Sequence, residues 1–361
     1  MPRVILVAPA AFKGTFGPRQ VADVFAAGVR RALPEATVLE CPVADGGDGL
    51  LDAVLPPGGS LRERVPVTGP LGRLVEAEFG WVDAETAIFE SATVCGLALL
   101  RPDERNPLRT TTRGVGELIA VAADRGAKTI VVGLGGSATV DGGTGAARGL
   151  GWIFQDRSGE PLPEGGGALN ELATIVAGWS LAARVIALAD VTTPLTGSDG
   201  AAPVFGPQKG ATPEVVELLA AGLEHLAGLW GQWGRPDLAT LPLGGAAGGL
   251  GAGLVVFAKA ELRGGAEWVF EQVGFDAALA KADLVLTGEG VFDPTSLVGK
   301  APGEVLRRAQ AAQKKVVVVA GRVQEMIGVH TVAGDGGVLD AAGLAALADL
   351  ATREAFRLPG S

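Results

Sequence analysis

The sequence is poor in the side chains that carry disulfide, thiolate and histidine chemistry. Its 361 residues include two cysteines, two histidines, two methionines and no tyrosine. Cys41 and Cys95 are too few for a disulfide scaffold or a thiolate metal site, and they fit a reducing compartment. His225 falls in a helical pattern and His330 in a strand-like one, so we expect both to be structural. Acid–base chemistry is therefore expected to come from carboxylates.

Positive charge is also scarce. The chain has 30 Lys and Arg against 40 Asp and Glu, a formal net charge of −10. Nucleic acids and anionic membranes select basic surfaces, so neither is an expected partner. The N-terminal stretch has too short an apolar run for a signal peptide, and residues 238–258, although uncharged, contain Pro242 and six glycines. We expect a cytoplasmic protein, monomer or homodimer, with a buried turn and helix at 238–258.

Glycine is what the sequence has in excess, with 56 residues. Without a collagen-like period this excess belongs to loops and tight turns. Residues 131–145, VVGLGGSATVDGGTG, run from an apolar strand core into a glycine loop. Glycine lets the backbone approach a bulky anion and present several N–H groups to it, and a following helix adds positive potential. The loop is a candidate phosphate cradle, although a plain tight turn would give the same pattern.

The length favours two domains, because single cores rarely grow beyond about 250–300 residues. Residues 4–7 are a short apolar run typical of a buried parallel strand, and the same pattern returns near the C-terminus, whereas residues 61–100 alternate as antiparallel strands do. The pattern predicts a two-domain α/β protein. Residues 1–62 and 282–361 form a discontinuous, Rossmann-like parallel-sheet domain, and 63–281 an inserted α/β domain with a mixed sheet. The site is expected in the cleft between them.

Carboxylates and lysines gather in the loops that follow the predicted strands. The carboxylates are Asp45, Asp141, Asp190, Glu289 and Asp293, and the glycine-flanked lysines are Lys13, Lys209 and Lys300. Carboxylates suit Mg²⁺ binding and base catalysis, and a lysine ammonium suits the capture of phosphate or carboxylate. Each residue alone could be a turn former, a helix cap or a solvated charge. Together they favour phosphoryl transfer or tight phosphate binding.

The order of the motifs resembles that of the class I bacterial glycerate kinases. The matching blocks are APAAFKGT, PVADGGDG, GLGGSATVDGG, ADVTTPLTG, FGPQKGATPE, GGAAGGLGAGL, LTGEGVFDPTSLVGKAP and VVVVAGRV, which span nearly the whole chain. The GHMP small-molecule kinases share a similar phosphate loop but not the remaining blocks. The resemblance implies an ATP-dependent kinase that uses Mg²⁺ and phosphorylates D-glycerate, with the 2-hydroxyl as the expected acceptor.

The resemblance also implies roles for individual residues. Asp190 is expected to be the base for the attacking hydroxyl, Lys209 to neutralise the transferring phosphoryl group, and Lys13 to hold a carboxylate or phosphate. The expected nucleotide-binding residues are Gly135, Gly136, Ser137, Ala138, Thr139 and Asp141. The expected substrate-binding residues are Lys13, Asp45, Gly46, Gly47, Glu289, Asp293 and Lys300. The expected metal ligands are Asp190, Glu289 and Asp293.

Two positions depart from the family pattern. Val291 stands where the family usually has Arg, and Thr295 where it usually has Gln. A missing guanidinium matters if it would touch the transition state and hardly matters if it only packs, so these departures bear on rate and substrate preference. Two alternatives stay open: a kinase of another small hydroxy acid or polyol, and a non-catalytic protein that binds nucleotide or phosphate.

Overall fold

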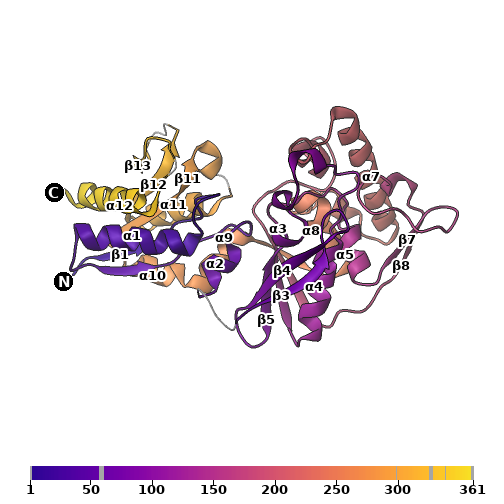
Figure 1. Cartoon of the computed structure of the whole chain (residues 1–361), viewed down its shortest axis with the longest axis horizontal. Coiled ribbons are helices and arrows are strands. Elements are labelled where there is room, and N and C mark those ends of the chain that lie inside the picture. Colours follow the sequence, from indigo (N-terminus) through magenta and orange to yellow (C-terminus); the bar gives the residue numbers. More distant parts are fainter. Residues whose placement is uncertain (1, 57–60, 298, 325–327, 338, 359–361) are drawn as a thin grey trace. The chain divides into compact units, whose positions relative to one another are not determined.

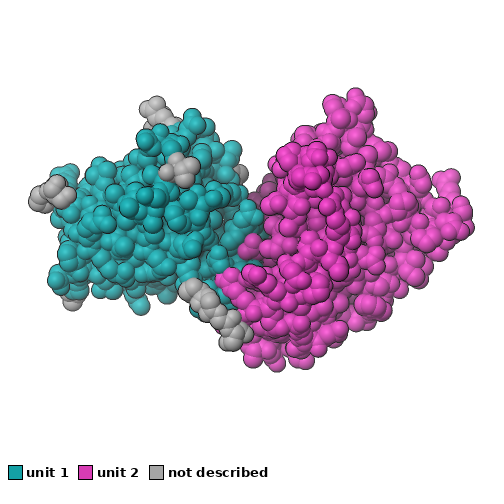
Figure 2. Space-filling model, viewed as in Figure 1, with its two compact units in different colours: residues 1–57, 265–361 teal, residues 58–264 magenta. Residues whose placement is uncertain are grey.

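The chain forms two compact units, each with its own sheet. The computed structural model describes residues 2–56, 61–297, 299–324, 328–337 and 339–358. The first unit consists of residues 1–57 and 265–361, and the second of residues 58–264 (Figure 1, Figure 2). The first unit is therefore discontinuous in sequence. The predicted α/β class is confirmed, with a parallel sheet in one unit and a mixed sheet in the other.

The first unit is built on a five-stranded parallel sheet with strand order β13-β12-β11-β1-β2. Its strands are β1 (Val4–Val7), β2 (Thr37–Glu40), β11 (Leu284–Phe292), β12 (Lys315–Val323) and β13 (Thr331–Ala333). Its helices are α1 (Pro18–Ala32), α2 (Leu50–Val54), α9 (Gly265–Val273), α10 (Phe275–Lys281), α11 (Ala301–Ala311) and α12 (Ala341–Phe356). The central strands are apolar because both faces are covered, by α1 and α12 on one side and by α9, α10 and α11 on the other.

The second boundary between the units lies after residue 264, whereas the sequence pattern places it after residue 281. Phe270 of α9 and Phe275 of α10 stack with ring centroids 4.5 Å apart. Both side chains are buried with residues of β1 and α11. The two helices therefore belong with the parallel sheet, because their apolar side chains are buried there.

The second unit holds a six-stranded mixed sheet with strand order β10-β9-β6-β5-β4-β3. Its strands are β3 (Arg62–Thr68), β4 (Leu74–Trp81), β5 (Thr86–Glu90), β6 (Thr129–Gly133), β9 (Arg184–Ala189) and β10 (Glu261–Gly264), with β7 (Ile153–Gln155) and β8 (Thr174–Val176) in a separate pair. Its helices are α3 (Ala92–Cys95), α4 (Arg113–Asp124), α5 (Thr144–Gly149), α6 (Ala201–Phe205), α7 (Pro213–Gln232) and α8 (Ala246–Phe257). Strand β4 pairs antiparallel with both β3 and β5. Strands β5, β6, β9 and β10 pair in parallel with their neighbours in the sheet.

The uncharged stretch at residues 238–258 folds as a turn followed by α8. Inside α8, Ala247, Gly248 and Gly249 have φ of 54°, 71° and 91°, so the backbone is left-handed for three residues. This turn packs against the glycine loop, because the Gly142 N–H donates to the Gly248 carbonyl at 3.1 Å. Within the described ranges, no helix is long and apolar enough to cross a membrane.

Gly248→Ala is expected to destabilise the second unit. A Cβ at this position would lie 2.0 Å from the Thr139 carbonyl oxygen, in a left-handed backbone that side chains rarely adopt. Strain and overlap together predict a loss of at least about 2 kcal/mol in the free energy of urea unfolding. The matched change Ala247→Gly removes a Cβ from a left-handed residue and is expected to be neutral or stabilising by up to about 1 kcal/mol. Equal stability of the two variants would contradict this packing argument.

Candidate active site

The glycine loop after β6 turns its carbonyl groups toward the protein. The Gly135 carbonyl accepts from Ser91 Oγ, and the Gly136 carbonyl accepts from the Leu97 N–H. The Ala138 carbonyl accepts from Thr110 Oγ1, and the Thr139 carbonyl accepts from Lys209 Nζ. The N–H groups of Gly135, Gly136 and Ser137 have no acceptor in the part of the chain that the structure describes. Gly136 is left-handed, with φ of 69°. A loop whose carbonyls are hydrogen-bonded to the protein and whose N–H groups lack an acceptor among the described residues is suited to bind an anion.

Lys209 places a buried cation against this loop. It ends the short 3-10 helix Pro207–Lys209 and is 2% exposed. Its Nζ donates to Ser137 Oγ at 3.0 Å and to the Thr139 carbonyl at 2.7 Å. Both acceptors are neutral oxygens, and no carboxylate among the described residues forms an ion pair with Nζ. A buried ammonium without a counter-ion is costly, and an anionic ligand would supply one.

Burial of Lys209 makes the stability of the second unit depend on pH. Desolvation lowers the pKa of Lys209 from 10.5 to about 8, against the opposing effects of Cys95 and Asp141. Between these values the unfolded chain binds more protons, so the free energy of unfolding rises with pH across this window. From pH 7 to 9.5 the expected gain from Lys209 is about 2 kcal/mol.

The gain is measured by urea unfolding with tryptophan fluorescence, because five of the six tryptophans lie in the second unit, at positions 81, 152, 179, 230 and 233. Lys209→Met is expected to show no such rise in the free energy of unfolding between pH 7 and 9.5. Burial raises the pKa of Cys95 to about 12, which lowers stability above pH 9 in both proteins. The difference between wild type and variant therefore isolates Lys209, and identical pH slopes would contradict the shift.

Asp141 is completely buried within the glycine loop. Its Oδ2 accepts from the Thr112 N–H and Thr112 Oγ1, both at 2.9 Å, and from the Gly145 N–H at 3.2 Å. Its Oδ1 accepts from the Gly143 N–H at 3.0 Å. Burial raises the pKa of Asp141 and these donors oppose the rise. The geometry favours a role in shaping the loop over the ligand contact that the sequence suggests. Thr110 and Thr112 hold the glycine loop through Ala138 and Asp141, but neither threonine lies in a sequence motif that would have predicted this role.

Asp190 directly follows β9, which pairs in parallel with β6. The Leu134 N–H donates to the Leu188 carbonyl at 2.9 Å, which extends this pairing to the start of the glycine loop. Asp190 is half-buried. The predicted base and the phosphate cradle thus leave the sheet at the same edge, from neighbouring strands.

A pocket of about 250 Å³ in the first unit collects most of the predicted substrate residues. Its charged lining residues are Lys13, Asp45, Asp48, Glu289, Asp293 and Lys300. Gly46 and Gly47 belong to the same loop as Asp45, and the Gly47 N–H donates to Asp45 Oδ1 at 3.4 Å. Asp48 lines the pocket although it is absent from the predicted set; its place in the DGGDG loop is the signal that could have found it. The exposed side chain of Val291 also lines the pocket.

Glu289 lies within β11, not in a loop after a strand as the sequence pattern suggests, because β11 continues to Phe292. Burial raises the pKa of Glu289, and the charges of Asp45 and Asp293 add to the rise, while Ser296 and Lys300 oppose it. Its Oε1 is buried and has no hydrogen-bond partner among the described residues. This oxygen can accept a hydrogen bond from a substrate hydroxyl or contact a cation.

Known proteins resemble this chain over most of its length. The glycerate kinase family matches residues 5–352. The chain belongs to the glycerate kinase family. It is 41% identical over 334 residues to the glycerate kinase of Bacillus subtilis (strain 168), covering 88% of this chain and 85% of that protein. It is 40% identical over 330 residues to the glycerate 2-kinase of Escherichia coli (strain K12), covering 90% and 87%.

A solved structure shares the fold of this glycerate kinase family member. The crystal structure of a putative glycerate kinase 2 from Salmonella typhimurium LT2 has a TM-score of 0.86 and 38% sequence identity, covering 99% of this chain and 98% of that chain. The resemblance inferred from the sequence blocks is confirmed, and the protein is a kinase. Membership of the family supports glycerate as the compound that is phosphorylated.

The sequence resemblance predicts a divalent metal, and the carboxylates fit one in part. Glu289 and Asp293 lie in the first unit and Asp190 in the second. Across the described ranges, no group of three His, Cys, Asp or Glu side chains is placed to hold a metal ion. The orphaned Oε1 of Glu289 is a carboxylate oxygen that a cation could use. Mg²⁺ commonly takes one or two protein carboxylates, and Glu289 and Asp293, which both line the pocket of the first unit, could supply them.

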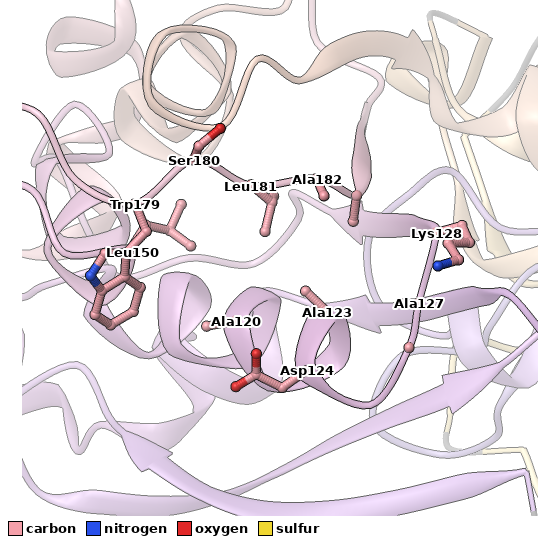
Figure 3. Close-up of a pocket in the computed structure, with 12 residues that line it drawn as sticks. Ala120, Ala123, Asp124, Ala127, Lys128, Leu150, Trp179, Ser180, Leu181 and Ala182 are labelled. Carbon is pink, nitrogen blue, oxygen red and sulfur yellow. The ribbon is translucent and has the colours of Figure 1, made fainter.

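A larger cavity, of about 420 Å³, lies in the second unit near the start of β6. Figure 3 shows it between α4 and residues 179–183, with the Trp179 ring at one end and Lys128 at the other. Its remaining lining is mostly alanine and leucine. Because the glycine loop follows the opposite end of β6, we assign this cavity no part in the kinase chemistry.

Proposed function

We propose that this kinase transfers the γ-phosphoryl group of ATP to the 2-hydroxyl of D-glycerate. The observation that carries the nucleotide part is the 2% exposed Lys209, whose ammonium meets neutral oxygens beside the free N–H groups of the glycine loop. Such a cradle suits an anion with several oxygens, as the β- and γ-phosphates of a nucleotide are. Gly135, Gly136 and Ser137 would donate backbone N–H groups, and Lys209 would stabilise the charge on the transferring group.

The pocket of the first unit is proposed for the acceptor. Lys13 and Lys300 would hold the carboxylate of glycerate, and Asp45 and Glu289 would accept hydrogen bonds from its hydroxyl groups. Asp190 would take the proton of the attacking hydroxyl. Mg²⁺, when bound, would neutralise charge on the phosphates. Glu289, Asp293 and Asp190 are the carboxylates that would hold it in this proposal.

Phosphoryl transfer requires the reacting atoms to approach within about 3–3.5 Å. The residues proposed for the nucleotide lie in the second unit, and those proposed for the acceptor lie in the first. We further propose a cytoplasmic location, which the two free cysteines suit. We propose a monomer or a homodimer, and light scattering of the purified protein distinguishes the two.

The test is ADP release from the purified protein with Mg²⁺ and ATP, with and without D-glycerate, followed by identification of the product by NMR. Glycerate-dependent ADP with phosphate on C2 is the expected result. Phosphate on C3 would reject the proposed position, and turnover with a different hydroxy acid or polyol only would reject the substrate. ATP binding without turnover for any acceptor would leave a nucleotide-binding protein.

A further inference from the structure

The residues after β11 form a bridge that ends on Lys300. Thr295 Oγ1 donates to Asp293 Oδ1 at 2.6 Å and accepts from Lys300 Nζ at 3.1 Å. The same Asp293 oxygen accepts the N–H groups of Thr295 and Ser296 at 2.8 and 3.3 Å. The Asp293 N–H donates to Ser296 Oγ at 3.1 Å, which closes the turn. The Thr295 hydroxyl is thus held by Asp293, whose carboxylate is bound by backbone N–H groups of the turn, and it accepts from the ammonium of a long, flexible side chain.

The bridge takes the place of a direct ion pair between Asp293 and Lys300. The Thr295 hydroxyl is instead the common partner of both groups, because it donates to Asp293 Oδ1 and accepts from Lys300 Nζ. In the described residues, Lys300 Nζ has no hydrogen-bond partner besides Thr295. An ammonium has three N–H donors, so two remain for a ligand in the pocket that Lys300 lines.

Two features beside Lys300 favour an anion at its ammonium, although four carboxylates also line the pocket. Lys300 is the N-cap residue of α11, where no side chain caps the helix and the first N–H groups carry positive potential. Lys13 lines the same pocket and adds a second positive charge. A carboxylate is the group of a small hydroxy acid that meets such a site, whereas the surrounding acidic side chains suit its hydroxyls.

We propose that Thr295 is a positioning residue that fixes Lys300 where it binds the carboxylate of the acceptor. This inference rests on the proposed function of the pocket. A lysine held in one rotamer before binding loses less side-chain entropy when the ligand arrives. The carboxylate takes no part in bond making, so the bridge strengthens the ground state and the transition state equally. Its loss raises KM for the acceptor and leaves kcat unchanged.

Thr295→Val tests this role because it keeps the branched shape and removes the hydroxyl. The expected result is a rise of about tenfold in KM for D-glycerate, with kcat within about twofold of wild type and KM for ATP unchanged. Thr295→Ser keeps the hydroxyl and is expected to return KM to within about twofold of wild type. In a Lys300→Met background, Thr295→Val is expected to have no further effect, because the side chain it positions is gone.

Unchanged KM in Thr295→Val, equal losses in the Val and Ser variants, or additive effects of Thr295→Val and Lys300→Met would each overturn the proposal. Calorimetric binding of D-glycerate without ATP separates this failure from failure of the proposed function. A wild-type protein that binds glycerate without phosphorylating it rejects the function, and the Thr295 comparison is then decided on Kd. A wild-type protein that does not bind glycerate overturns both.

Discussion

Lys209→Met is expected to lower kcat/KM for ATP by about a thousandfold. A preorganised cation in a water-excluded site acts on developing charge without reorganising, and removal of one such group costs about 10²–10³ in rate. Lys209 is also the positive charge that the nucleotide phosphates would meet on entry, so binding is expected to weaken as well. Steady-state kinetics with ATP as the varied substrate measure the loss, and calorimetry with a non-hydrolysable nucleotide measures the binding part.

The stability of the same variant separates this role from a structural one. Methionine removes a buried charge that has no ion-pair partner among the described residues, so the free energy of unfolding at pH 7 is expected to be unchanged or higher. Lys128→Met is the matched control, because Lys128 is an exposed lysine of the same unit. Activity of Lys209→Met within tenfold of the control would show that the buried ammonium does not serve the phosphates.

The parts of the fold that the sequence predicts are those with local signals. The apolar run at residues 4–7 is β1, as expected for a strand covered on both faces. Thr212 caps α7 directly before Pro213, and its side chain accepts from the Val215 N–H, which is a local signal of a helix start. The glycine loop is visible because glycine is needed where one backbone approaches another: a Cβ on Gly143 would lie 2.9 Å from the Gly253 Cα.

The parts that escape the sequence depend on partners far along the chain. Ser91 and Thr110 bind carbonyls of the glycine loop from 44 and 28 residues away, and neither stands in a motif. Glu289 lies in a strand instead of a loop because β11 stays paired with β12 as far as Phe292. Local pattern finds which residues sit at strand ends, whereas pairing and packing decide how far each strand continues and which side chains are left to bind a ligand.

Asp190→Asn is expected to lower kcat by about a thousandfold, while KM for D-glycerate changes little. An amide keeps the shape of the carboxylate but cannot accept the proton of the attacking hydroxyl, and general base catalysis contributes about 10²–10⁴ in rate. The matched change is Asp45→Asn, a carboxylate of the acceptor pocket in the first unit.

Asp45→Asn is expected to raise KM for D-glycerate with a smaller loss of kcat, because it weakens a contact that ground state and transition state share. The two variants differ in which parameter moves, so together they distinguish a proton acceptor from a substrate contact. Near wild-type turnover in Asp190→Asn, with a collapse of kcat in Asp45→Asn, would move the base to the first unit. The glycine loop and Lys209 would then serve the nucleotide alone, and the acceptor pocket would supply the carboxylate that takes the proton.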